Sequence, residues 1–383
     1  MKIEENIEIN ERRNTALDII RILALFCVVS VHFFLNIGFY EQKMVGVKMY
    51  LMTTMRSAFM ICVPLFLILT GYLMNNKRIS KKYYSGIIKT IIIYILASVT
   101  CIACKIIFYN YKISLKEIIL EILGFSAINY AWYVEMYIGL FLIIPFLNIL
   151  YNNIESKKNK KILIGTLLAL TAAPSLFNIF NFNVEGQNVM GKATYSYNKI
   201  VPQYWISIYP ITYYFIGSYL KEYNLKINKK INILSILLII IANGALNYFI
   251  SYGNVFVLGK HQDWASIINT IQSVLVFVLI LNINFETISK SNKKVIKCIS
   301  DYCFGAYLSS YIFDGLFYKI LNNFVPVVSS RFKYYIIIVP VVFMCSIILS
   351  TVFNLIFKLI MAKKNKQSIN FIKEDREKEV LNK

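Results

Sequence analysis

The chain has 383 residues, 57% of them hydrophobic and 15% aromatic, and its formal net charge is +21. Soluble domains contain about 45–50% apolar residues, and the excess here falls in blocks of about 20 residues, long enough to cross a bilayer, so the composition excludes an ordinary soluble domain. The lysines form short clusters between these blocks rather than one basic face. This pattern argues against a nucleic-acid partner and is typical of the loops of membrane proteins.

The apolar blocks predict an all-α fold, a polytopic transmembrane helical bundle of about ten spans. Residues 1–14 are polar and form a cytoplasmic N-terminal segment, residues 15–362 form one transmembrane domain, and residues 363–383 form a disordered cytoplasmic tail. The expected spans are 17–37, 51–74, 85–107, 132–152, 161–180, 204–221, 231–251, 265–284, 295–317 and 333–361.

The charges in the loops predict the orientation of these spans. Lysine and arginine are concentrated in alternate loops, at residues 77–82, 157–161, 221–230 and 290–297. Cytoplasmic loops carry the excess of basic residues in membrane proteins. We therefore place both termini in the cytoplasm, which requires an even number of spans.

The first span, LDIIRILALFCVVSVHFFL, carries the ionisable residues Asp18, Arg21 and His32. Each costs about 2.5–3.5 kcal/mol at the centre of a bilayer and so needs a partner or a function. Arg21 and His32 are eleven residues apart, close to three helical turns, and therefore share one helix face at a separation of about 16 Å. Asp18 lies within ion-pair reach of Arg21 and could do no more than cap the helix and neutralise this arginine.

These side chains suit an acyl transfer across the membrane. With the N-terminus inside, Arg21 lies near the inner end of the span and His32 near the outer end. A histidine can act as a general base near neutral pH, and Glu135 or Asp314, both expected toward the outer side, could orient its ring. The planar fork of an arginine suits the phosphate groups of a donor. The residues thus predict a phosphate-rich donor on the inside and an acceptor hydroxyl near the outside.

Structural roles stay open for some of the same residues. Lys89 could extend its amine to the lipid interface from a span end, and His32 could be a packing residue. No motif for a metal ion or a bound cofactor stands out in the chain, so we expect neither.

Four segments in order share features with a known family. They are the Arg21–His32 spacing, VPLFLILTGYLM at 63–74, WYVEMYIGLFLIIPFLN at 132–148 and FGAYLSSYIFD at 304–314. Together they resemble the acyltransferase-3 family of integral membrane acyltransferases, over about residues 15–360. The resemblance implies transfer of an acyl group, usually acetyl from cytoplasmic acetyl-CoA, to a cell-envelope or secreted glycan. It makes Arg21 and His32 the functional pair, with His32 catalytic.

The donor site departs from the family pattern. Many members carry an arginine-rich stretch after the second span, where this chain has KKYYSGIIKTIIIY. We expect Lys82 and Lys89 to serve there as point charges, beside Arg21 and its neighbour Asp18.

The substrate site is expected within the family-like segments, where Trp132, Tyr72 and Ser310 would line it. Many members have His-Pro where this chain has Ser309-Ser310. A second histidine is therefore not expected in the site.

The interpretation that follows is a membrane O-acyltransferase, a multi-pass protein of a cell membrane such as the bacterial cytoplasmic membrane. Its expected partners are acyl-CoA, a glycan acceptor and the lipid bilayer, with envelope-glycan synthesis proteins or a second copy of the chain as further candidates. The main alternative is a transporter or flippase of a glycan precursor, whose pathway the same charges would line. A membrane sensor or a glycan-assembly protein is a third.

Overall fold

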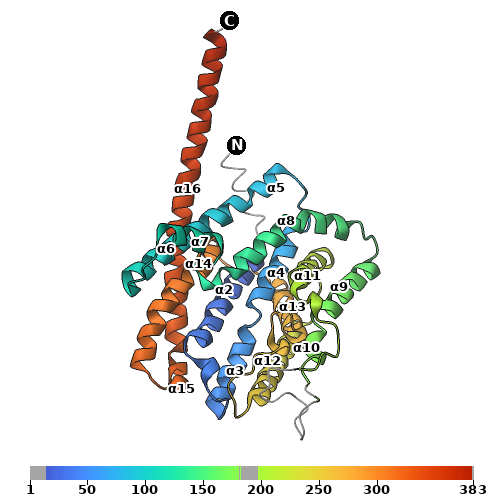
Figure 1. Cartoon of the computed structure of the whole chain (residues 1–383). Coiled ribbons are helices and arrows are strands. Elements are labelled where there is room, and N and C mark those ends of the chain that lie inside the picture. Colours follow the sequence, from blue (N-terminus) through green and yellow to red (C-terminus); the bar gives the residue numbers. More distant parts are fainter. Residues whose placement is uncertain (1–13, 181, 183–196, 382–383) are drawn as a thin grey trace.

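The computed structural model describes residues 14–180, 182 and 197–381, and every regular element within these ranges is a helix. The all-α prediction is therefore confirmed (Figure 1). The α-helices are α2 (Thr15–Asn36), α3 (Val47–Phe59), α4 (Cys62–Met74), α5 (Lys81–Ser85), α6 (Ile87–Tyr109), α7 (Leu115–Leu123), α8 (Trp132–Asn152), α9 (Lys157–Thr171), α10 (Pro174–Phe177), α11 (Tyr209–Tyr223), α12 (Lys229–Ser251), α13 (Ile267–Leu281), α14 (Lys290–Phe324), α15 (Val328–Arg331) and α16 (Tyr335–Leu381). Short 3-10 helices lie at Phe39–Glu41, Asn129–Ala131, Tyr204–Ile208, Lys260–Gln262 and Phe332–Tyr334.

Polar side chains fix where several helices begin. Asn14 precedes α2, and its side-chain oxygen accepts a hydrogen bond from the Ala16 amide at 2.9 Å. Ser114 and Glu117 form a reciprocal capping box at the start of α7. Such caps satisfy amides that have no partner inside the helix, so the start of α2, the helix that carries Arg21 and His32, is set locally.

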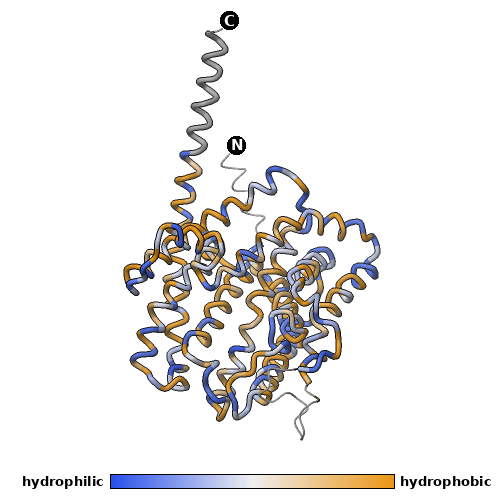
Figure 2. Tube along the Cα trace, viewed as in Figure 1, coloured by the Kyte–Doolittle hydropathy of each residue, from blue (hydrophilic) through white to orange (hydrophobic). Residues whose placement is uncertain are grey.

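Within the described residues, seven helical segments are long and apolar enough to cross a membrane. They are Thr15–Asn36, Val47–Met74, Lys81–Tyr109, Asn129–Asn152, Lys229–Ser251, Lys260–Leu281 and Val328–Lys363. Figure 2 shows hydrophobic residues along most of the bundle's helices and many hydrophilic residues in the connections between them. The chain is thus a membrane protein, while ten spans and the placement of both termini stay predictions.

The other three expected spans are helices of a different character. α9 and α11 have 15 residues each, about 22 Å, which is less than the hydrocarbon thickness of about 30 Å. α14 has 35 residues, and it packs against α2, α6 and α16. Its polar side chains, Ser300, Ser309, Ser310 and Asp314, are buried, so α14 need not be apolar because those side chains face protein and not lipid.

The N-terminal end of α2 and the C-terminal part of α16 lie at one end of the bundle. Ser300, near the start of α14, donates a hydrogen bond to Asp18. Two residues further along α14, the Tyr302 carbonyl accepts a hydrogen bond from Ser350 of α16. The beginning of α2 and this part of α16 therefore meet the same end of α14.

Residues 363–381 form the last part of α16. They continue α16 as a helix that projects beyond the bundle (Figure 1). From Val341 to Leu381 the chain contains no glycine or proline, and its charged end is rich in lysine and glutamate, which favour helix.

Two glycines bring α4 and α11 into backbone contact. A Cβ atom at Gly71 would fall far inside van der Waals contact with the Tyr214 carbonyl, and one at Gly217 would do the same at the Ile68 carbonyl. Ser218 donates a hydrogen bond across this contact to the Gly71 carbonyl at 3.4 Å. Small residues allow such close approach between membrane helices, which explains the glycine in the segment VPLFLILTGYLM.

We expect Gly71→Ala to lower the melting temperature of the purified protein, because the added methyl group forces α4 and α11 apart at a cost of about 1–3 kcal/mol. Gly139→Ala in α8 is the matched control, since nothing lies within 4 Å of the added Cβ. The control should be neutral or stabilising by about 0.5–1 kcal/mol. Thermal unfolding in detergent measures both, and equal melting temperatures would contradict the close contact.

Candidate active site

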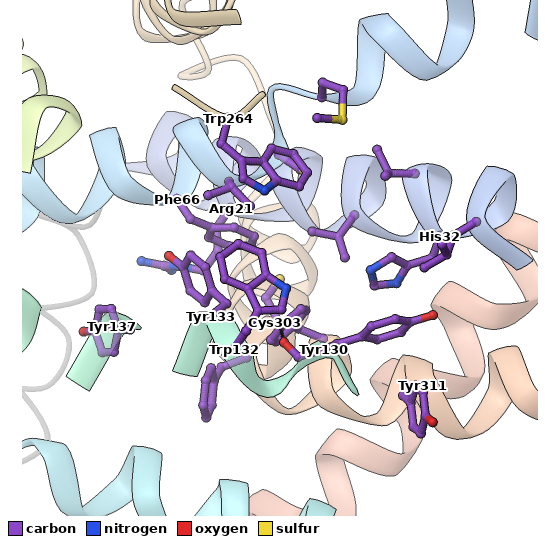
Figure 3. A pocket seen from close by; sticks show the side chains of 18 of the residues that line it. Arg21, His32, Phe66, Tyr130, Trp132, Tyr133, Tyr137, Trp264, Cys303 and Tyr311 are labelled. Carbon is purple, nitrogen blue, oxygen red and sulfur yellow. Dashed lines mark hydrogen bonds between the residues drawn. The ribbon is translucent and has the colours of Figure 1, made fainter. Parts of the chain in front are cut away.

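One large cavity follows α2 through the bundle. Its volume is about 890 Å³, and its lining extends from Arg21 past His32 to Tyr40. Its wall is mainly apolar and includes ten aromatic side chains: Tyr40, Phe66, Tyr130, Trp132, Tyr133, Tyr137, Trp264, Phe304, Tyr307 and Tyr311. In Figure 3, Trp132 and Trp264 are drawn between Arg21 and His32. The expectation that this pair shares one helix face agrees with their presence in one cavity.

His32 is held by an aromatic ring and a carboxylate. Its ring stacks on Tyr130, with centroids 3.6 Å apart and planes 24° apart. Its Nδ1 atom lies 3.5 Å from Oδ2 of Asp314. At this distance the buried Nδ1 atom has no hydrogen-bond partner, so Asp314 is the acid beside Nδ1 and Nε2 is the nitrogen left for a ligand in the cavity.

Asp314 is buried on α14 with a side-chain exposure of 1%. Tyr130 donates a hydrogen bond of 2.8 Å to its Oδ2 atom. Asn36, one turn after His32, donates to the Tyr130 hydroxyl at 3.1 Å and to the His32 carbonyl at 2.7 Å. The Tyr307 hydroxyl donates to the Tyr130 backbone carbonyl. The ring and the carboxylate around His32 are therefore positioned from three separate elements.

Arg21 lies at the other end of the cavity. Its Nη1 atom is 3.3 Å from Oδ1 of Asp18 and donates to Ser300 at 2.6 Å, while Ser300 donates to Asp18 at 2.7 Å. Asp18 is buried, but 26% of the Arg21 side chain is exposed. The guanidinium is thus anchored through one nitrogen, and its other nitrogens remain available to a ligand in the cavity. An arginine presented in this way suits phosphate or carboxylate oxygens.

The other residues expected in the site lie outside the lining of this cavity, except Trp132. Glu135 is exposed on α8, so Asp314 is the carboxylate that the structure places beside His32. Lys82 and Lys89 are exposed on α5 and α6.

Tyr72 and Ser310 belong to the packing of the bundle. Tyr72 packs on Phe277 with Lys221 over its ring. Ser310 is buried and donates to the Tyr307 carbonyl at 2.8 Å. Trp132, in contrast, lines the cavity and stacks with Trp264, with the ring centroids 6.2 Å apart.

Sequence reasoning missed Tyr130, Asn36 and Ser300. Asn36 had a usable signal, because it lies four residues after His32 and so on the same helix face. Tyr130 belongs to the short 3-10 helix Asn129–Ala131, and nothing in its local sequence connects it to a histidine in the first span. Among the residues that the structure describes, no three His, Cys, Asp or Glu side chains are grouped so as to hold a metal ion.

Comparison with known proteins adds one finding. The model of a family described as an acyltransferase domain matches residues 14–357, a range that includes Arg21, His32 and Asp314. No curated protein and no solved structure matches the chain.

The Asp18–Ser300–Arg21 cluster should contribute to stability. We expect Asp18→Ala to destabilise the protein by about 1–3 kcal/mol, because it removes the acceptor of one Ser300 hydrogen bond and the carboxylate beside Arg21. Glu155→Ala, at an exposed carboxylate, should change stability by less than about 0.5 kcal/mol. Thermal unfolding of the two variants beside the parent tests this, and a silent Asp18→Ala would show that the cluster does not hold α2 to α14.

Proposed function

The chain belongs to the acyltransferase-3 family of membrane acyltransferases, and on that premise we propose that it moves an acetyl group from cytoplasmic acetyl-CoA to a hydroxyl of a cell-envelope or exported glycan. The observation that carries the proposal is one cavity that contains an anchored arginine toward one end and an acid-oriented histidine further along. The proposed location is a bacterial cytoplasmic membrane. The activity common to the family is acyl transfer, and the acetyl donor and the glycan acceptor are the proposed part.

The donor would enter at the Arg21 end. Arg21 would pair its free nitrogens with phosphate oxygens of acyl-CoA. Arg21 and His32 are about 16 Å apart along α2, so a donor with a long flexible arm between its phosphates and its thioester can reach both. The mainly apolar wall between them suits an apolar arm, because it removes that arm from water.

At the His32 end, Nε2 would accept the proton of the acceptor hydroxyl as its oxygen attacks the thioester carbonyl. The new carbon–oxygen bond forms a tetrahedral intermediate, which collapses as the carbon–sulfur bond breaks. The leaving thiolate then takes the proton from the imidazolium, so the histidine ends neutral. Asp314 would stabilise the imidazolium in between, and Tyr130 would hold that carboxylate in place through its hydrogen bond.

The acceptor sugar has a surface on which to lie. Trp132 and Trp264 stack near the middle of the cavity wall, and indole rings combine an apolar face with an N–H donor. Such a pair can cover the face of a sugar ring while its hydroxyl points toward His32.

We expect His32→Ala to abolish acyl transfer and Asp314→Asn to reduce it by at least about 100-fold, because a general base and its orienting acid contribute about 10²–10⁴-fold. Glu135→Gln is the matched carboxylate control and should retain transfer. The measurement is the mass of envelope glycans from cells that express each variant, at equal amounts of inserted protein.

Two results would contradict this assignment. If Asp314→Asn retained full acyl transfer and Glu135→Gln lost it, Glu135 and not Asp314 would be the carboxylate that assists His32. Unchanged glycan acylation in cells without the protein, with accumulation of a precursor inside, would favour the transporter or flippase instead.

We also expect Arg21→Lys to fail in transfer, with a higher KM for acyl-CoA, because a point charge cannot replace the two-pronged contact of a guanidinium with phosphate. Lys82→Gln provides the comparison, since Lys82 is exposed and outside the cavity lining. Steady-state kinetics in liposomes, with the acyl-CoA concentration varied, give the KM for acyl-CoA and the transfer rate of each variant. If Arg21→Lys transfers at the full rate with an unchanged KM, Arg21 does not bind the donor phosphates.

A further inference from the structure

A second arginine, Arg56 of α3, lines the same cavity as His32 and Tyr40. The side chain is only 4% exposed. Its Nε atom donates to the Tyr40 hydroxyl at 3.1 Å, and its guanidinium carbon lies 5.7 Å and 5.0 Å from the rings of Tyr40 and Phe256. The guanidinium is therefore held in position on its flat side and at one nitrogen.

A second feature of Arg56 is the lack of a paired carboxylate in the part of the chain that the structure describes. Among the described residues no acidic side chain forms an ion pair with it, and its Nη1 atom is buried without a hydrogen-bond partner. Two titratable neighbours feel its charge, His261 and Cys62, and neither is a carboxylic acid. Because an unpaired buried charge is strongly unfavourable, Arg56 requires an acceptor that the described residues do not supply.

Arg331 shows how this protein satisfies an arginine that has a structural role. Arg331 is also buried, with 9% exposed. Its guanidinium donates to four backbone carbonyls, at Val325, Ile37, Asn322 and Pro326, over distances of 2.7–3.3 Å. All three of its nitrogens are occupied, and the residue ties the end of α2 to the connection after α14. Arg56, in contrast, makes one side-chain hydrogen bond to the described residues, at Nε, while its side chain lines the cavity.

We propose that Arg56 binds an anionic group of the acceptor, a carboxylate or a phosphate, in the part of the cavity near His32. Its partner Tyr40 follows α2, the helix that carries His32 near its C-terminal end and Arg21 near its N-terminal end. The two arginines thus mark different parts of the cavity, one for the donor and one for the acceptor. The inference rests on the proposed acyl transfer only in naming the ligand as the acceptor.

Binding without any donor tests the site separately from the reaction. The probes are methyl glucuronide, which carries a carboxylate, glycerol 3-phosphate, which carries a phosphate, and neutral methyl glucoside. Affinities would be measured by calorimetry or thermal shift on the purified full chain in detergent. The parent protein should bind at least one anionic probe more tightly than the glucoside, and the identity of that probe distinguishes a carboxylate from a phosphate acceptor.

Arg56→Met should weaken the preferred anionic probe by about 10–100-fold, the usual loss of one or two hydrogen bonds to a charged group, and leave the glucoside unchanged. Arg56→Lys should keep part of the preference as a point charge. Arg331→Lys is the matched control: it should lower the melting temperature and leave the preference for the anion intact.

The proposal is overturned if the parent protein shows no preference for either anion, or if Arg56→Met retains it. A separate outcome concerns the reaction. Anion binding through Arg56 without any transfer of acyl groups would contradict the proposed function and support the Arg56 site. Transfer of acyl groups to glycans without a preference for anions would support the proposed function and contradict the Arg56 site.

Discussion

The contact between α2 and α14 is the constraint on which the rest of this structure depends. α2 is apolar enough to span a bilayer, yet it carries Asp18, Arg21 and His32. Each would be costly in lipid, and α14 supplies the partners: Ser300 at one end and Asp314 at the other. The polar character of α14 follows from this role, since a helix that supplies polar partners for the charges of its neighbour cannot itself be uniformly apolar.

Because these two polar clusters lie at opposite ends of one helix pair, the space along α2 has two chemically distinct ends. Aromatic side chains from several helices line the space between them. An arginine with free donor positions and a histidine backed by a buried acid are suited to different tasks, recognition of an anion and transfer of a proton. Their separation along one rigid element allows the two tasks to be performed on two parts of a long substrate.

The three arginines inside the bundle show how one residue type takes different roles. Arg331 fills its hydrogen-bonding positions with backbone carbonyls at helix ends. Arg21 is half satisfied by Asp18 and Ser300, and Arg56 is bonded only to a tyrosine hydroxyl. A buried guanidinium requires hydrogen-bond acceptors. The acceptors that the protein does not supply are therefore the ones that a ligand has to provide.

The sequence by itself determined the features that depend on neighbours along the chain. Apolar blocks of helical length determined an all-α membrane protein, the eleven-residue spacing put Arg21 and His32 on one face, and four short segments in order identified the family. Helical periodicity is a local property, so it can be read without the fold.

Only the tertiary structure decided which side chains complete the site. It placed Asp314 beside His32 and left Glu135 exposed. It brought Tyr130 to the carboxylate of Asp314, 184 residues away, and Ser300 to the carboxylate of Asp18, 282 residues away. It also placed Lys82, Lys89, Tyr72 and Ser310 outside the cavity lining. Contacts at such separations depend on how helices pack, through close approaches such as Gly71 on Gly217, and packing is a property of the whole bundle that no single segment encodes.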